Sequence, residues 1–126
     1  ALQDGKLAMA LIDSVPAGQY GKEALTNLGL WDQVSSQVAQ ADNVRAALSL
    51  VALGEAPYGI VYASDAMAEP AVTVIATFPP DSHRPIIYPA AVLNASQSKD
   101  AGAFLESLRQ EPARSILEAQ GFIILK

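Results

Sequence analysis

The stretch KLAMALIDSVPAGQY (residues 6–20) decides the fold, because an apolar run leads at once into the start of a helix. Residues 6–12 form a short apolar segment of the kind found in buried strands. Pro16 cannot extend a strand ladder, but its fixed φ suits the first turn of a helix. From Ala17 to about residue 30 the apolar positions recur at helical spacing, and Gly29 suits the C-terminal cap. The stretch predicts a strand followed directly by a helix.

The same alternation continues along the chain. Further strands are expected at residues 36–40, 59–62, 72–78 and 86–93, and further helices at residues 42–54, 64–67, 98–108 and 112–121. Asp42 and Ser98 are the expected N-terminal caps of two of these helices. Alternating strands and helices predict an α/β fold with an open, mostly parallel sheet and flanking helices. The polar, proline-flanked turn at residues 79–85 is the expected boundary within the chain.

Composition narrows the classes of function. The 126 residues are 51% hydrophobic, which provides a core and excludes intrinsic disorder. Eight Lys and Arg against 13 Asp and Glu give a net charge of −5, which argues against nucleic acid or an anionic membrane as a partner. The sequence contains no cysteine, which excludes disulfides, thiolate metal sites and thiol catalysis. A small anion stays compatible with this charge, because backbone dipoles can bind it.

Groups that could carry catalysis are scarce. The single histidine, His83, lies in the 79–85 turn and is interpreted as a surface residue rather than a catalytic base. Asp13, Asp42 and Asp65 each precede a helical pattern, so helix capping explains them better than acid–base chemistry. No phosphate-binding loop, glycine-rich dinucleotide turn or metal-ligand spacing is present in the sequence. We therefore expect neither an enzyme nor a metal bound directly by protein ligands.

Two expected helices begin directly after expected strands, one at residues 15–18 and one at residues 42–44. A helix N-terminus carries unpaired N–H groups and a partial positive charge, so it can hold an anion without Lys or Arg. Gly18 would let an oxyanion approach the backbone, and Tyr62 could add a hydroxyl donor. A plain helix start at Pro16, a plain cap at Asp42 and a half-buried aromatic at Tyr62 explain the same residues. The Asp42 carboxylate would also repel an anion.

Several longer motifs point to a family. They are DSVPAGQYGKEAL (13–25), LGLW (28–31), DNVRAAL (42–48), EAPYGIVYASDA (55–66), ATFP (76–79), DSH (81–83), YPAAV (88–92) and GF (121–122). In this order, and over essentially the whole chain, they resemble the periplasmic molybdate-binding proteins of ABC transporters. The resemblance implies one lobe of a type II periplasmic-binding-protein fold plus the returning C-terminal segment.

The resemblance assigns residues 1–83 to the second, ligand-binding lobe and residues 84–126 to a segment that would complete the first lobe. Family members are about twice this length, so the chain is expected to be a C-terminal half. It could be an excised fragment, it could be completed by another chain, or its last segment could repack on its own lobe or on a symmetry mate. Apolar positions such as Phe104, Leu105, Leu108 and Ile116 favour self-association or a domain-swapped dimer.

The ligand implied by the resemblance is molybdate or tungstate, bound as an oxyanion by neutral donors and without any cofactor. Carried over by position, the donors are the Ala17 N–H, the Val44 N–H and the Tyr62 hydroxyl. The implied partner is the membrane permease of an ABC importer, and the implied location is the periplasm. The alternative is an oxyanion-sensing effector domain of a transcription regulator. That alternative requires a DNA-binding segment, and no stretch of this sequence is basic enough to provide one.

Overall fold

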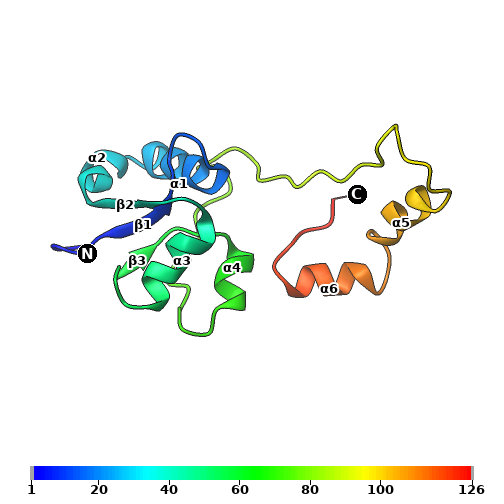
Figure 1. The fold of residues 1–126 in the computed structure, drawn as a ribbon. Helices are drawn as coiled ribbons and strands as arrows, with labels where there is room; N and C mark the ends of the chain where they lie inside the picture. The colour runs from blue at the N-terminus through cyan, green and yellow to red at the C-terminus, as the bar shows by residue number, and fades with distance from the viewer. Residues whose placement is uncertain (1, 126) are drawn as a thin grey trace. The chain divides into compact units, whose positions relative to one another are not determined.

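A computed structural model describes residues 2–125, and the chain divides into two compact units, residues 1–86 and residues 87–126 (Figure 1). The first unit contains β1 (Leu7–Ala10), α1 (Pro16–Asn27), α2 (Trp31–Val34), a 3₁₀ turn (Ser35–Gln37), β2 (Val38–Ala41), α3 (Val44–Ala52), β3 (Tyr58–Gly59) and α4 (Ala63–Ala68). The second contains α5 (Ala101–Ser107) and α6 (Ala113–Ala119). Within the described residues, no helix combines the length and the apolar character needed to cross a bilayer.

A three-stranded parallel sheet in the order β2-β1-β3 forms the centre of the first unit. Leu7 of β1 is in register with Val38 of β2 on one side and with Tyr58 of β3 on the other. All four residues of β1 are buried, as expected for the middle strand of a parallel sheet covered on both faces. The predicted α/β fold with a parallel sheet and flanking helices is confirmed.

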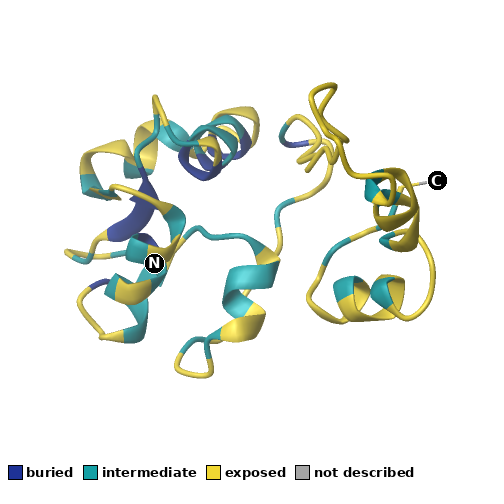
Figure 2. Cartoon of the chain, turned by 45° about the vertical axis from the view of Figure 1, so that its right-hand side comes forward, coloured by how far each residue is buried: buried dark blue, intermediate teal, exposed yellow. Residues whose placement is uncertain are grey.

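Alternate residues of β1 serve opposite faces of the sheet. Leu7 and Met9 pack with Leu25 of α1, whereas Ala8 packs with Ala47 of α3. Figure 2 shows the buried residues concentrated in β1 and along one side of α1. The core of this unit is therefore two thin apolar layers, one on each side of a single buried strand.

The strand and helix predicted from residues 6–20 form as expected. Pro16 is the first residue of α1, and Gly29, just past its end, has φ +69°, a conformation that glycine adopts without strain. Gly54, just past the end of α3, likewise has a positive φ of +76°. Local sequence signals thus set the start of α1 and the ends of both α1 and α3.

Two of the expected strands do not form. Residues 72–78 and 86–93 have no strand pairing in the described chain, although their apolar, β-branched composition predicts it. Strand propensity expresses how well side chains fit a pleated surface, and a ladder still needs a neighbouring edge. The strand expected at residues 59–62 is also shorter, because pairing with β1 covers only Tyr58 and Gly59 and ends on the Ile60 N–H, which donates to Ala8 O at 2.9 Å.

The turn at residues 79–85 is attached to α1. Asn27 donates from Nδ2 to the carbonyl of Ser82 (2.9 Å), and the Arg84 N–H donates to Glu23 Oε1 (2.8 Å). The Arg84 guanidinium also lies 5.1 Å from the centroid of the Tyr20 ring. These contacts explain why the first unit extends to residue 86, slightly beyond the expected boundary.

The second unit has helices but no buried residue among residues 87–125. Phe104 of α5 is 65% exposed and Ile116 of α6 is 62% exposed. The expected capping of α5 by Ser98 is wrong: Asp100 is the N-cap residue, no side chain caps the helix, and the Ser98 hydroxyl accepts from the Asp100 N–H (3.3 Å). Helices of seven residues each present too little apolar surface to make a core by themselves.

Candidate functional site

The carboxyl ends of β1, β2 and β3 lie at one edge of the sheet, because the three strands are parallel and adjacent. Each is followed within a few residues by a helix: α1 after β1, α3 after β2 and α4 after β3. Ala17, Val44 and Tyr62 lie at the starts of these three helices in turn. In open α/β sheets, ligands bind in the crevice beyond this edge.

Ala17 is the second residue of α1 and is almost completely buried. The N-cap residue, Val15, has no side chain that can accept a hydrogen bond from the first turn. The N–H groups of Ala17 and Gly18 have no acceptor among residues 2–125, whereas the Gln19 N–H donates to Val15 O at 3.0 Å. The start of α1 therefore presents two unpaired backbone donors.

Gly18 also has a packing role that the sequence did not indicate. A Cβ at this position would lie 2.3 Å from the carbonyl oxygen of Ala10 and 2.4 Å from that of Leu11. The missing side chain lets α1 pack directly on the end of β1. This packing requirement fixes where the first turn of α1 lies, and the close approach of an oxyanion at Gly18 stays a prediction.

Val44 is the first residue of α3, and its helix is capped by Asn43 rather than by the expected Asp42. Asn43 Oδ1 accepts from the Ala46 N–H at 2.9 Å, which satisfies the third N–H of the helix. The N–H groups of Val44 and Arg45 keep no acceptor in the described part of the chain. Because the capping group is a neutral amide, no capping carboxylate competes with an anion for the N–H groups at the start of α3.

The other two carboxylates expected as caps do not cap either. Asp13 is exposed and pairs with Lys22 (3.2 Å), because the N-cap position of α1 belongs to Val15. Asp65 lies inside the first turn of α4, whose N-cap residue is Tyr62. Its Oδ1 is 3.9 Å from Arg45 Nε, and its Oδ2 is buried with no hydrogen-bond partner in the described structure. Asp65 therefore joins α4 to the start of α3, a contact that no local sequence pattern reveals.

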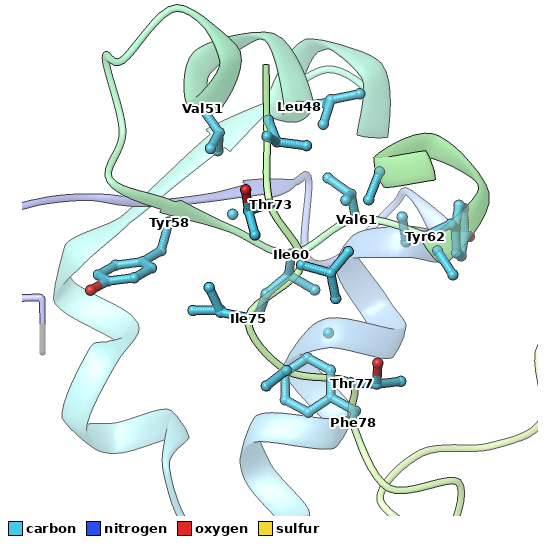
Figure 3. A pocket seen from close by; sticks show the side chains of 18 of the residues that line it. Leu48, Val51, Tyr58, Ile60, Val61, Tyr62, Thr73, Ile75, Thr77 and Phe78 are labelled. Atoms are coloured by element: carbon cyan, nitrogen blue, oxygen red, sulfur yellow. The ribbon is translucent and has the colours of Figure 1, made fainter. Parts of the chain in front are cut away.

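Tyr62 stands at the junction between β3 and α4, half-buried, and its carbonyl accepts from the N–H groups of Asp65 and Ala66 (both 3.1 Å). Tyr62 and Ala17 both line a pocket of about 560 Å³ in the first unit (Figure 3). Val44 does not line it, although Leu48, one turn further along α3, does. The structure brings two of the three expected donor residues to one pocket and places the third at the same sheet edge.

The carboxylates and the histidine near this edge form no metal-binding cluster in the described part of the chain. Within residues 2–125, no group of three or more His, Asp or Glu side chains is placed to hold a metal ion. His83 is partly buried, with Nδ1 2.8 Å from Arg84 O and its ring 6.2 Å, edge-on, from that of Tyr20. The arrangement is suited to holding a small anion by backbone donors.

Residues 1–123 match the family model for bacterial extracellular solute-binding proteins, and the chain belongs to this family. Its relatives include the molybdate-binding protein ModA of Haemophilus influenzae, 44% identical over 97% of this chain, and that of Escherichia coli, 47% identical over 98%. The chain spans about half the length of these curated relatives, 48% in both cases.

Solved structures agree with this assignment. A substrate-binding domain from Clostridium difficile, assigned to a molybdenum ABC transporter, superposes with a TM-score of 0.84 at 35% identity. The periplasmic molybdate-binding protein of Azotobacter vinelandii gives a TM-score of 0.77 at 26% identity. Each comparison covers 97% of this chain, with 54% and 55% of the respective solved chains. The predicted resemblance to molybdate-binding proteins of ABC transporters is confirmed.

Proposed function

We propose that this chain forms part of a solute-binding protein that captures molybdate or tungstate for an ABC importer. The observation that carries the proposal is the sheet topology: three adjacent parallel strands deliver Ala17, Val44 and Tyr62 to one edge. Two of these positions begin helices whose first N–H groups have no acceptor within residues 2–125. Relatives named for molybdate binding supply the identity of the anion.

The mechanism proposed is capture without reaction. The N–H groups of Ala17 and Val44 and the hydroxyl of Tyr62 are neutral donors fixed by the fold, so they replace water around a dianion without bringing a counter-charge. The net charge of −5 opposes binding at long range, and local donors must therefore supply the affinity. Molybdenum is held only through its oxygens, with no cofactor and no direct protein–metal bond.

Residues 1–83 act in this proposal as the second, ligand-binding lobe, and residues 84–126 as a segment that completes the first lobe. The remaining donors belong to the part of a family-length protein that this chain does not span. The 126-residue chain alone is then expected to bind weakly, since its donors form one wall of a site with no opposing wall. The proposed location is the periplasm, where such a protein would deliver its anion to the membrane permease.

Isothermal titration of molybdate and tungstate, with sulfate as the smaller competitor, tests the proposal in a family-length protein that contains residues 1–126. Tyr62→Phe removes one hydroxyl donor and should weaken binding by about 1–3 kcal/mol. Tyr58→Phe is the matched control, because Tyr58 lies in β3 before the carboxyl edge, and should leave the affinity unchanged. Equal affinities for the Tyr62→Phe variant and the wild type would remove Tyr62 from the site.

A further inference from the structure

Asp65 is a buried carboxylate to which the proposed anion site assigns no role. Its side chain is only 10% exposed, and its Oδ2 is fully buried with no hydrogen-bond partner in the described structure. Burying a carboxylate is costly unless hydrogen bonds or opposite charges compensate it. Asp65 does not line the pocket that Ala17 and Tyr62 share, so it is not placed as a direct ligand there.

The cation beside Asp65 is a weak partner. Arg45 Nε is 3.9 Å from Asp65 Oδ1, which is long for an ion pair, and the Arg45 side chain is 86% exposed. Ion pairs of exposed side chains contribute little to stability, because water screens the charges and a long side chain must be held in one position. The guanidinium of Arg45 alone therefore does not explain why the carboxylate is buried.

The first turn of α3 offers better partners. Helix α4 lies beside α3 (Figure 1), and the contact between Asp65 and Arg45 places the carboxylate next to this turn. Asn43 Oδ1 already accepts from the Ala46 N–H, whereas the N–H groups of Val44 and Arg45 have no acceptor in the described chain. A buried acceptor without a partner and two donors without an acceptor thus meet at one place, and pairing would satisfy both sides.

The backbone links the same carboxylate to Tyr62. Tyr62 is the N-cap residue of α4, and its carbonyl accepts from the Asp65 N–H at 3.1 Å. Asp65 therefore lies in the same helical turn as Tyr62, while its side chain contacts the turn that begins with Val44. A hydrogen bond from this side chain to α3 would fix the distance between the two segments that carry the Tyr62 hydroxyl and the Val44 N–H.

We propose that Asp65 is a positioning residue of the anion site. From α4, its carboxylate accepts a hydrogen bond from the Arg45 N–H and so holds Tyr62 at a set distance from Val44. The inference rests on the proposed function, because it concerns the same site.

This arrangement divides the N–H groups at the start of α3, which have no partners within the helix. Asn43 accepts from the third of them, Asp65 accepts from the second, and the first, that of Val44, stays available to the oxyanion. A fixed distance between donors favours an oxyanion of one size. Asp65 therefore also contributes to the selectivity for molybdate over the smaller sulfate.

Residue-resolved amide hydrogen exchange, in a family-length protein that contains residues 1–126, tests the bond without any anion. The Arg45 amide should exchange slowly in the wild type and at least about 10-fold faster in Asp65→Ala. Asp65→Asn, whose amide oxygen can still accept, should retain most of the protection. Asp42→Asn is the matched control, because it removes the same charge from an exposed side chain beside the start of α3, and it should change nothing.

The Ala46 amide, bonded to Asn43, is the internal reference. Equal acceleration of the Ala46 and Arg45 amides in Asp65→Ala would mean that the whole start of α3 frays, and the positioning role would be abandoned. An unprotected Arg45 amide in the wild type would overturn the proposal without any variant, even if Asp65→Ala did not fold. A wild-type protein that binds neither molybdate nor tungstate would instead overturn the proposed function, which this anion-free measurement does not test.

Isothermal titration of molybdate and of sulfate tests the effect on the site. Asp65→Ala should weaken molybdate binding by about 10-fold or more and reduce the preference for molybdate over sulfate, because a charge-assisted hydrogen bond that positions a donor is lost. Asp65→Asn and Asp42→Asn should keep the wild-type preference. Equal weakening for both anions, or an unchanged affinity, would contradict a positioning role. Tighter binding by Asp65→Asn than by Asp42→Asn would show that the carboxylate acts by repelling the anion, and it would overturn the proposal.

Discussion

The two units of the chain contain similar secondary structure signals but differ in what those signals achieve. In residues 1–86, helices α1 and α3 cover opposite faces of a buried strand, so residues such as Met9 and Ala47 are fully buried. In residues 87–126, α5 and α6 form from helical sequence signals but have no side-chain cap, and no described residue is buried. Helix signals therefore give helices in both units, while a core arises only where a sheet offers a surface to cover.

The largest expected difference between the units is in the free energy of unfolding that is lost when an apolar side chain is shortened to alanine. Met9→Ala removes a fully buried side chain between β1 and α1 and should lower the free energy of unfolding of the first unit by about 2–5 kcal/mol. Ile116→Ala, 62% exposed in α6, should leave it unchanged within about 0.5 kcal/mol.

Urea unfolding followed by Trp31 fluorescence measures this effect, because the single tryptophan packs against the core of the first unit. Comparable losses in the Met9→Ala and Ile116→Ala variants would mean that the two units share one core, and the comparison would be wrong.

Replacing glycine by alanine should have opposite effects on stability in the two units. Ala has a higher helix propensity than Gly by about 1 kcal/mol. A Cβ at Gly102 in α5 would meet nothing within 4 Å. Gly102→Ala should therefore raise the helicity measured by circular dichroism. Gly18→Ala in α1 puts a Cβ 2.3 Å from Ala10 O and should cost about 1–3 kcal/mol despite that propensity. A stabilised Gly18→Ala variant would show that α1 can move away from β1, and the packing role of Gly18 would be discarded.

The smallest expected effect is in helix capping. Asn43→Ala removes the acceptor for the Ala46 N–H and should destabilise the first unit by about 1 kcal/mol. Asp100→Ala, at the N-cap position of α5, should change little because no side-chain cap bond exists there. Asp42→Ala is a second control next to the true cap, and urea midpoints compare all three variants. If Asp42→Ala proved more costly than Asn43→Ala, the cap would belong to Asp42 as the sequence pattern suggested.

Some features of the candidate site could be predicted from the sequence, and others could not. Ala17 and Val44 follow from helix starts placed after strands, and both positions do begin helices with unpaired N–H groups in the described chain. Asn43 and Asp42 are both good capping residues, so their choice depends on backbone conformation, and Asn43 occupies the extended N-cap position. The contact of Asp65 with Arg45 joins residues twenty positions apart, and no local pattern indicates it.

By itself, the sequence determined the elements with strong local signals: the buried strand at β1, the proline that begins α1, the glycines that end α1 and α3, and the family membership. The helix start and the helix ends depend on a few neighbouring residues and on φ, so the local sequence is enough to indicate them. Only the tertiary structure decided which expected strands pair. Residues 72–78 and 86–93 have the composition of strands, but a ladder requires an edge supplied by another segment, and no such edge is paired with them within residues 2–125.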